Sequence, residues 1–235
     1  MTSKTFVLVH GAWHGGWAWR RVADRLKQRG HQVFAPTLTG LGERSHLMSR
    51  DIKLATHITD IVNVFKYERL SDVVLCGHSY GGFVISGVAE QVQSAISSIV
   101  FLDAFFPENG QSVADNTRPE VQAAVSAAVQ RGELGIPSRA AAAFGVNEKD
   151  RAWVDALIGP QPIATFTDKI VLSGARDRIA KKTYIRAKGY DNPAFDVALA
   201  KLKSNSAWRT YEVPSGHDVM VDMPDRLVEI LLEAA

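Results

Sequence analysis

The chain contains a single cysteine, Cys76, among its 235 residues. No internal disulfide can form, which suits a reducing compartment. Cys76 lies in an apolar stretch, so we expect a buried and unreactive thiol. No apolar run is long enough to cross a bilayer, and Met1 is followed within a few residues by a predicted strand, which leaves no room for a signal peptide. We therefore expect a cytoplasmic protein that does not insert into membranes.

An excess of charge of either sign is also absent. The chain has 27 Lys and Arg against 25 Asp and Glu, a formal net charge of +2, and no dense basic cluster. This balance argues against nucleic acid as a partner. The apolar fraction of 46% and the charged fraction of 22% are typical of a globular protein. The length predicts a single domain over residues 1–235 with a sizeable core, and leaves the oligomeric state open, a homodimer included.

Apolar, β-rich runs alternate with amphipathic segments along most of the chain. The predicted strands are residues 5–9, 31–36, 73–77, 95–102, 183–187 and 208–213. The predicted helices are residues 17–29, 56–67, 81–93, 192–203 and 224–235. Alternation of this kind predicts an α/β fold with a mostly parallel sheet of about six strands, right-handed crossovers and flanking helices.

The alternation of predicted strands and helices is interrupted between residues 108 and about 165. This segment is alanine-rich and polar, has a helical tendency and contains no strong strand. We interpret it as a helical cap insertion over a core made of residues 1–107 and 166–235. Residues 169–174 fit either a further short strand or an extended link.

Residues 72–85 form the most informative stretch. They read as a buried strand, a turn with the pattern G-x-S-x-G, and the start of an apolar helix. This context is typical of a nucleophile elbow, which exposes the hydroxyl of its central serine, here Ser79. Gly77 and Gly81 fit because a side chain would crowd so tight a turn. The alternative is a glycine-rich turn with an ordinary surface serine.

A serine hydroxyl needs a base within hydrogen-bond reach, and the pKa of histidine suits that role. His217 is the only histidine after Ser79 in the chain. It follows the last predicted strand, so it is expected at the carboxyl edge of the sheet, where Ser79 also lies. A histidine with a purely structural role is the alternative.

The acid that would orient His217 is harder to assign. Asp103 ends the apolar strand after the elbow, and a carboxylate there needs a partner. Asp191 follows the strand at residues 183–187 after a short loop, but a solvated turn aspartate explains it equally simply. We favour Asp103 and keep Asp191 as the alternative. Asp177 and Asp196 are weaker candidates, and the side chain of Asp218 is expected to point away from its neighbour His217.

An oxyanion hole needs two hydrogen-bond donors. We expect the backbone N–H of Tyr80, which follows the nucleophile, and that of Ala12 in the loop after the first strand. A plain glycine-rich connector is the alternative for that loop. His10, His14 and His78 form no convincing metal set with nearby carboxylates, and His10 is expected to tie down its own loop. We predict no metal and no cofactor.

Five motifs extend from the first predicted strand to the last helix. They are residues 6–17 (FVLVHGAWHGGW), 36–42 (PTLTGLG), 77–82 (GHSYGG), 101–105 (FLDAF) and 216–221 (GHDVMV). Together they resemble the α/β-hydrolase superfamily, in the branch that holds plant methylesterases and hydroxynitrile lyases, and most closely its bacterial esterases. The resemblance implies an α/β-hydrolase fold, a Ser-His-acid mechanism, a helical cap over an apolar pocket and no cofactor.

The chain departs from the branch in two places. The plant proteins usually carry their acid in a Glu-Asp pair after the strand that matches residues 183–187, whereas residues 188–191 here read Lys-Gly-Tyr-Asp. The lyases carry threonine in place of Gly11 and lysine in place of Asp218. Without those two residues a lyase activity is not expected.

The sequence thus predicts a serine carboxylesterase that hydrolyses small to medium apolar or aryl esters through an acyl-enzyme. The aromatic residues Phe105, Phe106, Phe144, Trp153 and Phe166 suggest an apolar pocket. The alternatives are a lyase-like enzyme and a non-catalytic protein that binds a small ligand. The natural substrate stays open.

Overall fold

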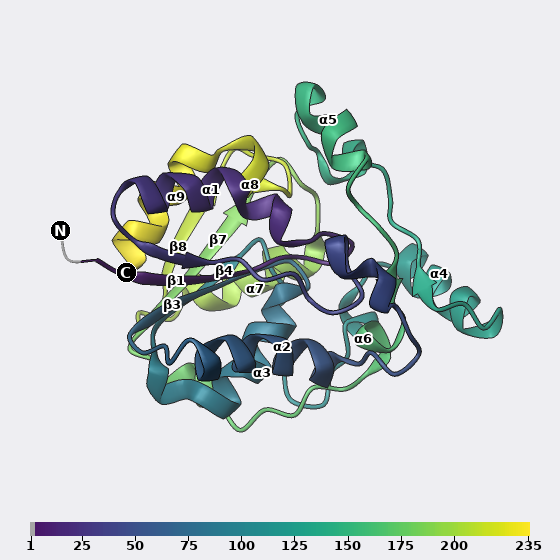
Figure 1. Cartoon of the computed structure of the whole chain (residues 1–235), viewed down its shortest axis with the longest axis horizontal. Helices are drawn as coiled ribbons and strands as arrows, with labels where there is room; N and C mark the ends of the chain where they lie inside the picture. The colour runs from purple at the N-terminus through teal and green to yellow at the C-terminus, as the bar shows by residue number, and fades with distance from the viewer. Residues whose placement is uncertain (1–2) are drawn as a thin grey trace.

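Six strands form one parallel sheet. They are β1 (Thr5–Val9), β2 (Gln32–Phe34), β3 (Val73–His78), β4 (Ile96–Leu102), β7 (Lys181–Ala187) and β8 (Arg209–Val213). The computed structural model describes residues 3–235 and orders these strands β2-β1-β3-β4-β7-β8 (Figure 1). The predicted parallel sheet of about six strands is confirmed. The strand order changes direction between β1 and β3, and open α/β sheets place their sites beyond the carboxyl ends of strands at such a point.

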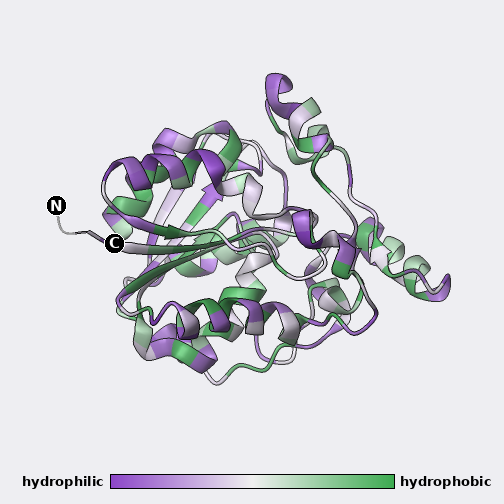
Figure 2. Ribbon diagram, viewed as in Figure 1, coloured by the Kyte–Doolittle hydropathy of each residue, from purple (hydrophilic) through white to green (hydrophobic). Residues whose placement is uncertain are grey.

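Helices cover both faces of the sheet. They are α1 (Arg20–Gln28), α2 (Leu54–Tyr67), α3 (Gly81–Val92), α7 (Pro193–Lys203), α8 (Val219–Asp222) and α9 (Pro224–Ala234). Helices α1 and α9 pack on one face, and α2 and α3 pack on the other (Figure 1). Both faces are covered, which explains why all six residues of β3 are buried and all but His78 are apolar or small. Figure 2 shows the apolar strands between helices whose outer faces are polar.

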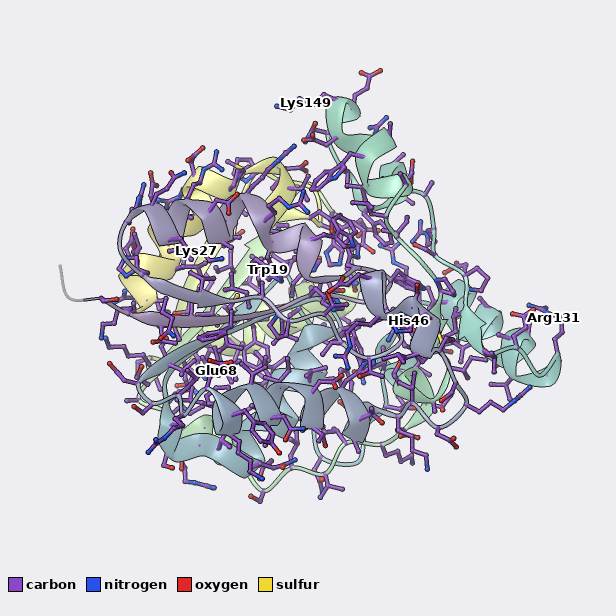
Figure 3. All side chains as sticks on the ribbon, in the orientation of Figure 1. Trp19, Lys27, His46, Glu68, Arg131 and Lys149 are labelled. Atoms are coloured by element: carbon purple, nitrogen blue, oxygen red, sulfur yellow. The ribbon has the colours of Figure 1, made fainter. Side chains whose placement is uncertain are left out.

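A local sequence signal explains where α7 begins. The side chain of Asn192 accepts a hydrogen bond from the Ala194 N–H at 3.1 Å, and Pro193 occupies the first position of α7. The predicted helix at residues 17–29 is divided, because a 3₁₀ turn (Gly16–Trp19) precedes α1. Trp19 is fully buried, while Lys27, Glu68, Arg131 and Lys149 extend outward in Figure 3.

The segment from residue 108 to about 165 lies outside these layers (Figure 1). It contains α4 (Pro119–Gln130) and α5 (Glu148–Asp155), as its helical tendency predicts, and α6 (Ala164–Thr167) follows it. It also contains two strands that the sequence did not predict, β5 (Gly135–Ile136) and β6 (Gln161–Pro162), paired antiparallel. Each has only two residues, too few for a periodic pattern. Residues 169–174 form an extended link and no strand.

Short 3₁₀ helices complete the chain. Besides Gly16–Trp19 they are Gly42–Leu47, Gln93–Ala95, Ala114–Asn116, Ala141–Phe144 and Ala175–Arg178. The helix Ala141–Phe144 contains most of the alanine run of the segment between residues 108 and 165. Cys76 is buried, as predicted, and burial raises the pKa of its thiol. No helix within residues 3–235 combines the length and hydropathy of a membrane span.

The central strand β3 should dominate stability. Leu75 is fully buried and lies between Val7 and Ile99 of the neighbouring strands. We predict that Leu75→Ala lowers the free energy of unfolding by about 2–5 kcal/mol, because it removes packed methyl groups and leaves a cavity. Val197→Ala on α7, where the residue is 69% exposed, serves as the control and should change it by less than about 0.5 kcal/mol. Urea titrations measure both, and equal losses would contradict the prediction.

Candidate active site

Ser79 lies on a tight turn between β3 and α3. Its φ of 54° is in the left-handed region, which non-glycine residues rarely adopt. Its N–H donates to the Leu102 carbonyl at 3.2 Å, and its own carbonyl accepts from the Gly82 N–H at 3.0 Å. A Cβ on Gly77 would approach the Gly81 carbonyl oxygen to 2.6 Å, so this turn excludes a side chain there. The turn thus holds Ser79 at the carboxyl edge of the sheet.

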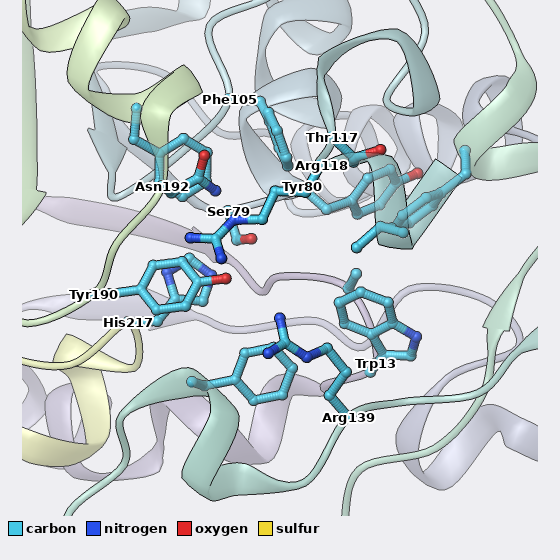
Figure 4. Close-up of a pocket in the computed structure, with 15 residues that line it drawn as sticks. Trp13, Ser79, Tyr80, Phe105, Thr117, Arg118, Arg139, Tyr190, Asn192 and His217 are labelled. Atoms are coloured by element: carbon cyan, nitrogen blue, oxygen red, sulfur yellow. The ribbon is translucent and has the colours of Figure 1, made fainter. Parts of the chain in front are cut away.

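His217 lies in the loop after β8. Its backbone N–H donates to the Phe144 carbonyl at 2.7 Å, and its side-chain Nδ1 hydrogen-bonds to Asp103 Oδ2 at 2.6 Å. Because Asp103 takes Nδ1, the proton-accepting nitrogen is Nε2. His217 and Ser79 line the same pocket (Figure 4). No hydrogen bond joins their side chains within the described residues, and such contacts often tighten only when substrate binds.

Asp103 follows β4 and is fully buried. Its φ is 40°, and its N–H donates to the Ile185 carbonyl at 2.6 Å. Its second oxygen, Oδ1, accepts from the Arg186 guanidinium at 2.8 Å and from the Ala187 N–H at 3.0 Å. A buried carboxylate is stable only when paired in this way. The structure therefore places a fully hydrogen-bonded carboxylate against His217.

Asp191, the alternative acid, lies elsewhere. Its side chain is 86% exposed and pairs with Arg118 at 3.0 Å. Asp196 pairs with Arg186, at 3.0 Å, and so belongs to the network around Asp103 without touching His217. Of the acids considered from sequence, the structure brings only Asp103 to the imidazole within residues 3–235.

Sequence reasoning missed Arg186. This arginine sits near the carboxyl end of β7 and is 1% exposed, with its guanidinium shared between Asp103 and Asp196. Those two carboxylates raise its pKa, although burial opposes the effect. An arginine inside an otherwise apolar strand end was the signal, since a buried guanidinium requires carboxylate partners.

The loop after β1 brings a second backbone N–H toward the pocket. Ala12 and Tyr80 both line it, and neither N–H donates a hydrogen bond to another backbone group within residues 3–235. The residue after Ala12 is firmly held: Trp13 has φ 66°, and its N–H donates to Gln161 Oε1 at 3.0 Å. The pocket that Ser79 lines thus contains two residues whose amide N–H groups have no backbone partner among the described residues, and an oxyanion hole requires two such donors.

His10 holds this loop from behind, as expected. Its Nδ1–H donates to the Gly11 carbonyl at 2.8 Å, and its Nε2 accepts from the Leu38 N–H at 3.0 Å. Complete burial lowers the pKa of His10 to about 3. The ring is therefore neutral at physiological pH, which this pattern of one donor and one acceptor requires.

A buried ion pair lies beside the loop, and sequence reasoning missed it. Asp218 points away from His217, as expected, and its Oδ2 lies 3.0 Å from His14 Nε2. Both side chains are almost fully buried. Burial disfavours the charged His14 ring, but the Asp218 carboxylate outweighs burial and raises the pKa of His14. His14 Nδ1–H in turn donates to the Ala12 carbonyl at 2.7 Å. The sequence signal for this pair was Asp218 itself, a charged residue between His217 and the apolar residues 219–221, because a buried carboxylate needs a partner.

Aromatic rings form much of the pocket wall. The lining residues are Ala12, Trp13, Ser79, Tyr80, Phe105, Thr117, Arg118, Val121, Arg139, Phe144, Phe166, Tyr190, Asn192, Phe195 and His217. Tyr190 stacks on the His217 ring with 4.4 Å between centroids. Two of the aromatic residues expected here lie elsewhere: Phe106 packs against Trp208, and Trp153 packs against Trp17. Sequence pattern does not separate pocket aromatics from core aromatics.

Comparison with known proteins gives consistent results. Residues 6–230 match the model of the alpha/beta hydrolase family. A carbendazim-hydrolysing esterase from Nocardioides sp. is 41% identical over 96% of this chain and 97% of its own length. Methylesterase 7 of Arabidopsis thaliana is 28% identical over 93% of this chain and 80% of its own.

A solved structure gives the same fold. An extracellular α/β-hydrolase from a Paenibacillus species, which shares structural and functional homology with a tobacco salicylic acid binding protein, aligns with a TM-score of 0.84. The alignment covers 99% of each chain at 26% identity. The chain therefore belongs to the alpha/beta hydrolase family and is an esterase-like member of it.

Proposed function

We propose that this protein is a serine carboxylesterase that acts through an acyl-enzyme. The observation that carries the proposal is the 2.6 Å hydrogen bond between His217 Nδ1 and Asp103 Oδ2, in the pocket that Ser79 lines. Similarity to an esterase over nearly the whole chain supports the same reaction class. The aromatic wall supports apolar or aryl esters as substrates.

In the first half of the reaction, Ser79 Oγ attacks the ester carbonyl while His217 Nε2 accepts its proton. The carbonyl oxygen becomes an oxyanion that accepts hydrogen bonds from the Ala12 and Tyr80 N–H groups. The bond to the alkoxy group then breaks, and His217 gives its proton to the departing alcohol. Asp103 stabilises the imidazolium in between.

In the second half, His217 takes a proton from water, and the resulting hydroxide attacks the acyl carbon. The bond from that carbon to Ser79 Oγ breaks, the serine recovers its proton from His217, and the carboxylic acid leaves. The sum is ester plus water giving acid plus alcohol. In both halves His217 accepts and then returns each proton that is transferred.

The lyase alternative conflicts with the space around Gly11. A Cβ at this position would lie 2.8 Å from His78 Nδ1 and 3.0 Å from Ser79 Cβ. A threonine there, as the lyases carry, would require these side chains to shift. The loop as it stands therefore does not accommodate the threonine that the lyases carry.

Removing the nucleophile is the first test. We predict that Ser79→Ala lowers kcat/KM for an aryl acetate by about 10³-fold or more, while oxyanion stabilisation leaves a small residual rate. Ser98→Ala is the matched control, because Ser98 is also buried and its hydroxyl has no hydrogen-bond partner among the described residues. Mass spectrometry of protein treated with an organophosphate should locate the adduct on Ser79. Full turnover by Ser79→Ala would refute the proposal, and a wild-type protein without turnover or adduct would favour the ligand-binding alternative.

The acid has its own test. We predict that Asp103→Asn lowers kcat by about 10³- to 10⁴-fold, because the amide cannot stabilise the imidazolium or hold its tautomer. Asp191→Asn should change kcat less than about threefold, since that side chain is exposed at a surface ion pair. Circular dichroism checks that both variants fold. A larger loss from Asp191→Asn would reverse the assignment.

The buried His14–Asp218 pair should hold the oxyanion loop. We predict that Asp218→Asn lowers kcat by about tenfold to a hundredfold with little change in KM, because small displacements of a catalytic group are costly. Affinity for a boronic acid, which mimics the tetrahedral intermediate, should fall in parallel.

The control for this test is Asp150→Asn. Asp150 is 6% exposed and pairs with Arg21 at 2.7 Å, but it lies outside the pocket. It should lower the melting temperature and leave kcat unchanged. If Asp218→Asn likewise affected only stability, the pair would have no role in positioning.

A further inference from the structure

The pocket that holds Ser79 has a charge imbalance that an ordinary neutral ester does not require. Two of its lining residues are arginines, Arg118 and Arg139, and none is an aspartate or glutamate. Arg118 immediately precedes α4, and Arg139 lies beyond β5, so both come from the segment between residues 108 and 165. Figure 4 shows both guanidinium groups turned into the pocket.

The two arginines are not equally neutralised. Arg118 pairs with Asp191 at 3.0 Å, on the outer side of the pocket. Arg139 forms no ion pair within residues 3–235, and its only hydrogen bond there is accepted by its backbone carbonyl. One full positive charge at this rim therefore has no carboxylate partner among the described residues.

The paired arginine, Arg118, lies near a ring that contacts His217. The Arg118 guanidinium carbon is 6.0 Å from the centre of the Tyr190 ring, which stacks on His217. Burial raises the pKa of Tyr190, and the positive charges of Arg139 and Arg118 act on it in the opposite direction. A bound acyl group that extends from Ser79 along Tyr190 would meet the guanidinium groups.

We propose that the pocket selects esters whose acid part is an aromatic ring bearing a second, free carboxylate. Aromatic walls favour a flat ring, and a guanidinium binds a carboxylate through two parallel hydrogen bonds. The inference rests on the proposed esterase function. Its reaction is the same: the ester bond of an aromatic half-ester is hydrolysed to the dicarboxylate and the alcohol, while the free carboxylate stays on the arginines.

The test compares two substrates of equal size on the wild-type protein. Monomethyl terephthalate carries the free carboxylate, and methyl 4-carbamoylbenzoate replaces it by a neutral amide. We expect kcat/KM to be about tenfold or more higher for the half-ester, mainly through KM, because a charged hydrogen bond is worth more than a neutral one. Raising the ionic strength should shrink this preference.

Variants assign the preference to its residues. Arg139→Gln should reduce kcat/KM for the half-ester about tenfold and leave the amide ester within about twofold. Arg118→Gln should act in the same direction and more strongly, since it also leaves Asp191 without its partner at the rim. Arg226→Gln on α9 removes the same charge outside the pocket and should change neither substrate.

The outcomes separate this inference from the proposed function. Equal kcat/KM for the two substrates, with Ser79-dependent turnover of both, would overturn the inference and leave the esterase standing. A preference that survives in both arginine variants would also overturn it. Absence of turnover with either ester, together with no adduct on Ser79, would overturn the esterase proposal itself.

Discussion

The buried carboxylate of Asp103 is the group on which the rest of the site depends. An unpaired anion at 0% exposure would be strongly destabilising, so the fold must supply partners from several elements at once. Arg186 and the Ala187 N–H come from β7, and His217 comes from the loop after β8. The parallel register of β4, β7 and β8 therefore determines where the imidazole lies. The same contacts stabilise the buried Asp103 carboxylate and orient the His217 imidazole.

A second buried pair organises the opposite side of Ser79. Asp218 follows His217 directly and points the other way, to His14, whose ring also binds the Ala12 carbonyl. The loop after β8 thus touches both the acid and the loop that would carry an oxyanion donor. The nearby rings of His10 and His78 are different, because burial lowers the pKa of each and keeps it neutral. The buried charges of Asp103, His14 and Asp218 all have partners.

The sheet and the segment between residues 108 and 165 contribute differently. The residues that directly follow β3 and β4 and the loop after β8 supply Ser79, Asp103 and His217, whereas that segment supplies Arg118 and Arg139 to the pocket wall. The residues of buried ion pairs tolerate little substitution, whereas the side chains of Arg118 and Arg139 are partly or fully exposed and can vary without disturbing the core. In the proposed enzyme, the residues that select the substrate are therefore different from the residues that carry out the reaction.

Local pattern in the sequence determined the strands and helices, the turn around Ser79 and the place of His217 after the last strand, because hydrophobic periodicity and glycine spacing act over a few residues. Asp103 and Asp191 each follow a predicted strand. The sequence pattern therefore favoured Asp103 but did not determine which of the two carboxylates contacts His217. Only the tertiary structure decided which carboxylate meets His217, that Arg186 holds it, and that Phe106 and Trp153 lie outside the pocket. Such contacts join residues far apart in the chain, and they depend on strand order and side-chain direction, which no local pattern encodes.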